Sequence, residues 1–246
     1  MNTRLTTLRP AHGRFACLPL ARLPLARFVV TASAALCLAP LGAHAAQSAD
    51  LTVKGMIRPA ACDIDLSGGA TADFGVISAR ALSATTPTVL PARIVTLTIT
   101  CNPGAKVGIT TTDNRSGTVN DAASAALIGT PGYTFGVGEV GGKNIGAYSL
   151  MLGTNAGVQA TADGRNVTAI YSQDGGNAWI SSLQGPAQPG VRLHGWAAPG
   201  ESLPGTFNLI TQPIKVTLAL GKTGDLPDLS QDVPIDGLAT ISLKYL

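Results

Sequence analysis

The chain has 246 residues, of which 13% are charged and 4% aromatic, and it carries 29 Gly and 16 Pro. This composition favours many short strands joined by turns over a helical fold. The formal net charge of +3 comes from the first 45 residues, whereas residues 46–246 carry 12 bases against 14 acids, which excludes the basic surface that a nucleic-acid or anionic-membrane partner requires.

The first 45 residues are predicted to be a secretory signal peptide. They contain five Arg and no acid, with an apolar core between Phe28 and Leu38 and a small-x-small cleavage site at Ala43-His44-Ala45. The apolar run is too short and too rich in Ala for a stable membrane span. Cleavage before Ala46 leaves residues 46–246 as one domain, which is long enough to bury a sizeable core.

Cleavage would also decide which cysteines remain. It removes Cys17 and Cys37 and keeps Cys62 and Cys101. An exported chain with two cysteines is expected to form one disulfide. The alternative is a pair of free, buried thiols. A closed loop of roughly 40 residues would stabilise the fold by about 4 kcal/mol, because it restricts the unfolded chain.

The first predicted elements are two strands separated by Pro59. Leu51, Val53 and Ile57 alternate with the more polar positions between them, which predicts a strand over residues 51–58. After Cys62, Ile64 and Leu66 share one face of a second strand. Ser67-Gly68-Gly69 then predicts a turn.

The next segment, "RIVTLTITC" at residues 93–101, is the clearest strand of the sequence. Its inward face is predicted to hold Val95, Leu97, Ile99 and Cys101. A turn is expected at residues 102–104, and a further strand follows it with Val107 and Ile109 on one face. Asp121–Leu127 predicts a short helix. Residues 128–146 contain seven glycines and predict a long flexible connection.

The second half of the chain supplies the remaining strands. Candidates lie at residues 148–152, 166–171, 178–181, 191–196 and 213–220. The last strand, "ATISLKYL", places Ala239, Ile241, Leu243 and Tyr245 on one face, and such an apolar terminus is expected to be held by a partner. Strands at intervals of about 10–20 residues favour an antiparallel sandwich.

Three landmarks in this pattern resemble the pilin subunits of chaperone–usher fimbriae. "LTVKGMIRPAACDID" resembles the first pilin strand, with alternating residues, a Gly and then a Cys. "VTLTITC" resembles the strand that carries the partner cysteine. "ATISLKYL" resembles the pilin terminal strand with its penultimate aromatic residue, here Tyr245. The overall layout is similar to that of a family of fimbria-associated exported proteins classed as a domain of unknown function.

The resemblance implies an all-β, immunoglobulin-like sandwich that carries a Gly-rich insertion and lacks its last strand. A periplasmic fimbrial chaperone, and then the N-terminal extension of another fimbrial subunit delivered through an outer-membrane usher, would fill the open groove. The expected recognition strand contains Ile241, Leu243, Tyr245 and Leu246, with the terminal carboxylate as a handle for the chaperone. The expected donor-like strand contains Leu51, Val53 and Ile57.

The sequence departs from the pilin pattern at the donor end. Pilin donor extensions usually have ten or more residues before this strand, whereas only residues 46–50 precede Leu51 here. This difference favours a minor, terminal or non-polymerising subunit. The alternative to an open groove is a complete sandwich in which both end strands pair internally.

Three other motifs lack the features of a cofactor, calcium or catalytic site. "GVGEVG" at residues 136–141 lacks the helix that a dinucleotide site needs. Asp225, Asp228, Asp232 and Asp236 lack the spacing of a calcium loop. His194 has no accompanying nucleophile motif. The sequence therefore predicts a protein that is not an enzyme and that uses no cofactor and no metal ion.

The predicted function is that of a structural or minor component of a bacterial surface fimbria. Its route would lead through the periplasm to the cell surface, the fimbrium or the medium. Its partners would be the chaperone, the usher and other subunits, with no nucleic acid. The alternative is a secreted or periplasmic module that binds carbohydrates or surfaces without polymerising, with Trp179 and Trp196 as candidate ligand contacts.

Overall fold

The structure is a computed structural model that describes residues 51–57, 59, 61–130 and 132–246. The predicted signal peptide, residues 1–45, lies outside these described residues. The chain divides into two units, Met1–Lys54 and Gly55–Leu246, and the fold described below is that of the second unit. Among the described residues, no helix has the length and the apolar character needed to span a membrane.

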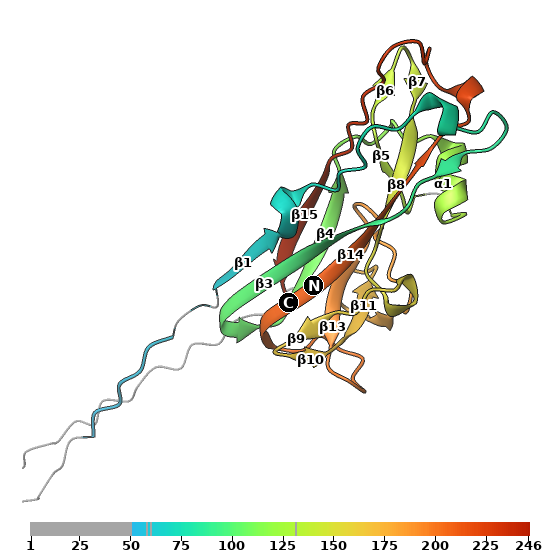
Figure 1. Cartoon of the computed structure of the whole chain (residues 1–246). Helices are drawn as coiled ribbons and strands as arrows, with labels where there is room; N and C mark the ends of the chain where they lie inside the picture. Colours follow the sequence, from blue (N-terminus) through green and yellow to red (C-terminus); the bar gives the residue numbers. More distant parts are fainter. Residues whose placement is uncertain (1–50, 58, 60, 131) are drawn as a thin grey trace, which may run out of the picture. The chain divides into compact units, whose positions relative to one another are not determined.

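The first sheet is antiparallel and contains the two longest strands of the fold (Figure 1). Its strands follow the order β1 (Ala61–Leu66), β3 (Arg93–Ala105), β14 (Phe207–Leu220), β8 (Gly146–Met151) and β5 (Phe135–Gly136). Three short strands pair beside this path: β2 (Thr88–Val89), β9 (Thr161–Ala162) and β10 (Arg165–Asn166).

The second sheet is also antiparallel and ends on the C-terminal strand. Its order is β12 (Ile180–Ser181), β11 (Thr168–Ser172), β13 (Leu193–Ala197), β4 (Val107–Asp113) and β15 (Ala239–Tyr245). A separate hairpin joins β6 (Glu139–Val140) to β7 (Lys143–Asn144). Single 3-10 turns occupy Ser67–Ala70, Ala79–Ala81, Thr154–Ala156 and Thr223–Asp225.

The core lies between the two sheets because both have one apolar face. On β3 the predicted inward residues, Val95, Leu97, Ile99 and Cys101, are all buried, whereas Ile94 faces outward and is 56% exposed. The alternation follows from the two-residue period of a strand. The indole N–H of Trp196 on β13 donates to Gln212 Oε1 on β14 over 2.8 Å, so a hydrogen bond joins the two layers within the core. The prediction of an all-β sandwich is confirmed.

The helix α1 (Asp121–Leu127) covers one end of the outer face of the first sheet. The Asn120 side chain caps its N-terminus by accepting a hydrogen bond from the Ala123 N–H. Ala123 packs against Ala147 on β8 and Ala219 on β14. Small side chains allow this close approach, and the predicted helix is confirmed with its predicted bounds.

Two connections differ from the prediction. The turn expected at residues 102–104 is absent, because β3 continues to Ala105, which pairs with Phe207. Residues 128–146, predicted to be a flexible connection, instead contain β5 and the β6–β7 hairpin and bury Phe135, Val137 and Ile145. Their glycines permit tight turns, while their three large apolar side chains anchor the segment in the core.

Candidate functional site

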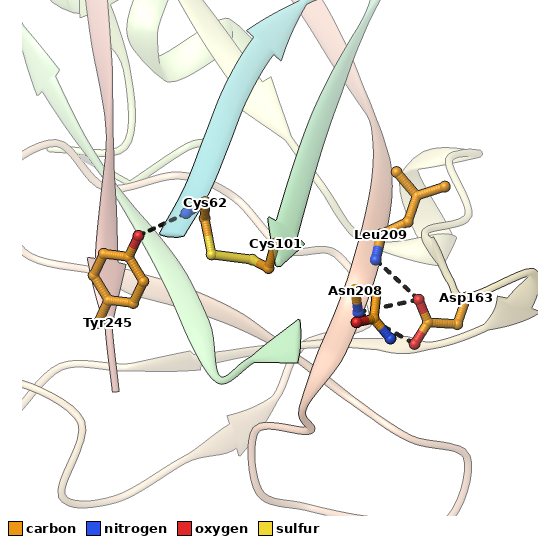
Figure 2. Close-up of a disulfide and its surroundings, with 6 residues drawn as sticks. All are labelled: Cys62, Cys101, Asp163, Asn208, Leu209 and Tyr245. Carbon is orange, nitrogen blue, oxygen red and sulfur yellow. Dashed lines mark hydrogen bonds between the residues drawn. A yellow bond between two sulfur atoms is a disulfide. The ribbon is translucent and has the colours of Figure 1, made fainter. Parts of the chain in front are cut away.

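The sandwich has one side on which both sheets end in an unpaired strand. Within the described residues, β1 pairs only with β3, and β15 pairs only with β4. The free edges of these two strands lie on the same side of the fold, since the Tyr245 side chain reaches from β15 to the backbone of β1 (Figure 2). An unpaired edge exposes a row of backbone donors and acceptors that another strand can use.

The backbone groups on the free edge of β15 follow from its register. Hydrogen bonds from Asn114 N to Leu238 O and from Leu246 N to Lys106 O bracket an unbroken pairing of β15 with β4. In an antiparallel ladder, alternate residues direct N–H and C=O to opposite sides. The odd-numbered residues therefore present both groups to the free edge. They are Ala239, Ile241, Leu243 and Tyr245.

The same odd-numbered residues of β15 direct their side chains toward the core. They lie opposite inward residues of β4, with Leu243 beside Ile109 and Tyr245 beside Val107. Burial falls steeply toward both edges: Ile109 is 0% exposed and Tyr245 is 55% exposed. On the first sheet, Ile99 is 0% exposed, whereas its neighbour Ile64 on β1 is 38% exposed. Each sheet thus ends in inward apolar side chains that nothing covers fully.

A cavity of about 900 Å³ continues from this open side along the inner face of the first sheet. The floor of the cavity is apolar and comes from the central strands of that sheet. It consists of Val95, Leu150, Ile214, Val216 and Leu218. Leu66 on β1 and Ile241 on β15 line the same cavity, so it joins the two free edges.

Two irregular segments form the walls of the cavity. The first wall is residues 71–77, which follow β1, and the second wall is residues 229–238, which precede β15. Phe74 and Ile77 on the first wall, and Leu229 and Val233 on the second, pack partly buried against the core. Neither wall belongs to a sheet. The groove is defined as the cavity with its two walls and the two free edges. It is bordered by two segments that lie outside any sheet and by two strands that are each paired on one side.

The second wall is fixed at the end where it meets β15. The Asp236 N–H donates to Val137 O, and the Asp236 carboxylate pairs with Arg115 over 2.7 Å. Gly237 follows, and a Cβ at this position would lie 2.9 Å from the ring of Tyr148. The chain can therefore pass close to Tyr148 as it enters β15 only because residue 237 is Gly.

The disulfide and Tyr245 lie where β1 begins and β15 ends. Cys62 on β1 and Cys101 on β3 are bonded, which confirms the predicted bridge (Figure 2). The Tyr245 hydroxyl accepts a hydrogen bond from the Cys62 N–H over 2.8 Å. This bond joins the edge of one sheet to the edge of the other, and it occupies a donor that an incoming strand would otherwise use.

The structure places the predicted recognition strand at the groove and does not form the predicted donor-like strand. Ile241, Leu243 and Tyr245 lie on the free edge, and Leu246 continues the pairing with β4 through its N–H. Leu51, Val53 and Ile57 are 89%, 86% and 99% exposed, and residues 51–57 form no strand, so the strand predicted there is wrong, while the donor role of these residues stays a prediction. A strand needs a partner edge, and no segment pairs with these residues.

The two tryptophans predicted as candidate ligand contacts differ in their burial. Trp196 is 1% exposed and bonded to Gln212, so its prediction as a ligand contact is wrong. Trp179 is half-buried, packs its ring on Gly195, and donates its indole N–H to Gly176 O. A Cβ at residue 195 would clash with that ring, so Gly195 is what permits the packing. The Trp196 ring therefore serves the core, whereas the Trp179 ring covers Gly195 of β13.

His194 and the aspartates considered for catalysis or metal binding are the remaining candidate residues. His194 is 1% exposed, and burial followed by the Arg192 charge lowers its pKa to about 3. Asp225 pairs with Lys222, and Asp236 pairs with Arg115. No three His, Cys, Asp or Glu side chains of the described residues gather closely enough to hold a metal ion.

The walls of the groove were missed at the sequence level. The segment "TADFGVI" carries Ala72, Phe74 and Ile77 at spacings that suit neither a regular strand nor a helix. Leu229 and Val233 stand within an acidic, proline-containing loop. The available signal was the presence of large apolar residues in segments without periodicity, because such residues need a surface to cover.

Comparison with known proteins identifies relatives along most of the chain. A family described as "Protein of unknown function (DUF1120)" matches residues 51–170. The chain is 26% identical over 229 residues to the uncharacterized protein YhcF of Escherichia coli K12, covering 84% of this chain and 94% of that protein. It is 29% identical over 245 residues to protein GltF of the same organism, covering 87% and 95% respectively. Neither name states an activity.

Proposed function

We propose that this protein is a structural or minor component of a bacterial surface fimbria whose sandwich is completed by a β-strand from another chain. The observation that carries the proposal is the groove. Two sheet edges are free on the same side, and the inward side chains at those edges remain partly exposed. An apolar cavity of about 900 Å³ extends between them.

Strand addition would satisfy both the backbone and the core. An inserted strand can bond to the odd-numbered residues of β15, while its alternate side chains enter the cavity. Four or five apolar side chains, each contributing roughly 1.5–3 kcal/mol on burial, would stabilise the complex by on the order of 10 kcal/mol before the costs of association. Without the strand, the edge and the exposed apolar row are a hazard for aggregation.

The compartment and the partners follow from the same proposal. The disulfide indicates an oxidising, exported location. The predicted signal peptide would direct the chain to the periplasm, where a fimbrial chaperone would insert the first strand into the groove. An usher and other subunits would then replace the chaperone strand at the cell surface. The groove has the form of a binding site for a strand, so we infer a role without enzymatic activity.

The resemblance to pilins supports the proposal through specific residues. The cysteine pair joins the first strand to its neighbour, and Tyr245 lies on the terminal strand at the open side. The alternative of a carbohydrate-binding module loses support, because Trp196 is buried and Trp179 is engaged with Gly195.

The direct test is expression of the full chain in a bacterial host with and without a fimbrial chaperone and usher. We expect the exported protein to co-purify with the chaperone and to accumulate at a lower level in its absence, because the open groove favours aggregation. A stable, monomeric protein obtained alone, with no affinity for the chaperone, would contradict strand donation.

A further inference from the structure

Each wall of the groove carries one aspartate that lines the cavity. Of the described residues that line the cavity, the charged ones are Asp73 on the first wall and Asp232 on the second. Both side chains are exposed. An extended strand inserted between the walls would turn alternate residues inward to the cavity and the others outward. The outward residues would then lie between the two carboxylates.

The negative charge at the walls is only partly compensated. The ion pairs formed by the described residues use Asp225 and Asp236, and they leave Asp73 and Asp232 without a cation. Asp228 adds a third carboxylate beside the second wall. Hydrogen bonds from the Ser230 N–H and hydroxyl hold the pKa of Asp228 below its ordinary value, so it stays ionised.

One cation lies next to the first wall. The Arg93 guanidinium stands over the Phe74 ring at 5.6 Å, and its Nε donates to the backbone oxygen of Asp73. Arg93 therefore weakens the field of Asp73. Asp232 has no such neighbour among the described residues, which makes the second wall the more negative of the two.

We propose that the groove selects a strand whose outward residues are cationic. This inference rests on the proposed function and adds to it the chemistry of the partner. Apolar inward residues would supply affinity for the cavity, whereas Lys or Arg on the outward face would be distinguished from neutral or acidic residues by the two walls.

This chain contains a segment with the required pattern. Leu51, Val53 and Ile57 occupy one side of an extended chain, and Lys54 and Arg58 occupy the other. The segment from a second copy would place apolar side chains in the cavity and both cations between the walls. A peptide of residues 50–59, "DLTVKGMIRP", is therefore the probe.

The test measures the affinity of the purified, exported protein for labelled peptides by fluorescence anisotropy. Three peptides are compared: the natural sequence, a Lys54→Gln/Arg58→Gln version, and a Lys54→Glu/Arg58→Glu version. The Gln peptide loses two exposed ion pairs, and each pair changes the affinity by about 1.4- to fivefold, so we expect this peptide to bind roughly two- to thirtyfold more weakly. The Glu peptide should bind more weakly still, and 0.5 M salt should remove the difference.

Variants of the protein test whether Asp73 and Asp232 cause the preference for cationic peptides. Asp73→Asn/Asp232→Asn should bring the three affinities together without lowering that of the Gln peptide. Asp225→Asn removes one carboxylate from a residue that does not line the cavity, and it should preserve the preference. Equal binding of all three peptides to the natural protein would overturn the charge selection and leave the proposed function standing. Failure of every peptide to bind would overturn the assignment of this segment as the inserted strand, whereas the chaperone experiment decides the proposed function.

Discussion

His194 shows how strongly a single residue is affected by the core of this fold. Its ring lies on the inner face of β13, and neither ring nitrogen has a hydrogen-bond partner among the described residues. Burial, and then the charge of Arg192, lowers the pKa of His194 to about 3. The folded protein therefore keeps this imidazole neutral at pH values at which the unfolded chain protonates it.

The sign of the resulting pH dependence is fixed by this difference. Below pH 6.5 the His194 imidazole is protonated in the unfolded state and stays neutral in the folded state. The free energy of unfolding therefore falls as the pH falls toward 3. For this residue alone, we expect the free energy of unfolding to fall by about 1.5 kcal/mol between pH 6.5 and 5. Urea titrations of the natural protein and of His194→Phe over this range isolate the effect.

The Phe variant serves as the reference because it keeps an aromatic ring and sacrifices no hydrogen bond. Its stability should change less with pH than that of the natural protein, since the acidic residues are common to both. Parallel pH profiles for the two proteins would mean that His194 does not resist protonation in the folded state.

The Tyr245 hydroxyl makes a second residue-scale prediction. Replacing Tyr245 with Phe removes the bond to the Cys62 N–H and keeps the ring. Because the bond is exposed, we expect a loss of only about 0.5–1 kcal/mol in the free energy of unfolding, measured with urea. Tyr245→Ala, which also removes the ring, should cost more. Equal stability of the Phe variant and the natural protein would show that the bond between the two edges contributes nothing.

At the scale of the element, β15 has one face directed to the core and one face open to water. Leu243 points inward, and its neighbour Ser242 points outward. We expect Leu243→Lys to weaken binding of the 50–59 peptide at least tenfold, because a charge would stand beside the inserted apolar residues. Ser242→Lys should leave the affinity within about twofold. A similar loss for both variants would mean that strand addition does not use this face.

The β1–β3 pair is the second element with a measurable contribution. The disulfide spans 39 residues of sequence. In the chain-entropy model, Cys62→Ser/Cys101→Ser should lower the free energy of unfolding by about 4 kcal/mol. Urea unfolding with and without reductant checks this value, since reduction of the natural protein should approach the stability of the double variant. A loss below 1 kcal/mol would show that the bridge does not restrict the unfolded chain.

The elements differ in how well their sequence determined them. β3 and β14 alternate strictly over many residues, so their strand state and inward faces were predictable. α1 was marked by its Ala-rich run, Asp121–Leu127. Residues 51–57 also alternate, yet they form no strand. An alternating sequence is compatible with a strand, but the segment becomes a strand only when it pairs with the edge of a neighbouring sheet.

At the scale of the molecule, the sandwich is unequal in its two layers. The central strands of the first sheet, β3 and β14, have 13 and 14 residues, whereas β4 and β13 of the second have 7 and 5. The inner face of the first sheet therefore extends past its partner layer. The two walls cover part of that excess, and the cavity is the remainder. The open side was expected from the resemblance, but the walls depend on tertiary packing that no local pattern encodes.

The claim on which this account depends is that the free edge of β15 accepts a strand. Residue-resolved amide hydrogen exchange on the purified protein, with and without saturating 50–59 peptide, tests it most directly. In the isolated protein, the amides of Thr240, Ser242 and Lys244 should exchange slowly because they bond to β4. Those of Ala239, Ile241 and Leu243 should exchange quickly and become protected when the peptide is added. Slow exchange at all six positions without peptide, or rapid exchange at the odd positions with it, would contradict the account.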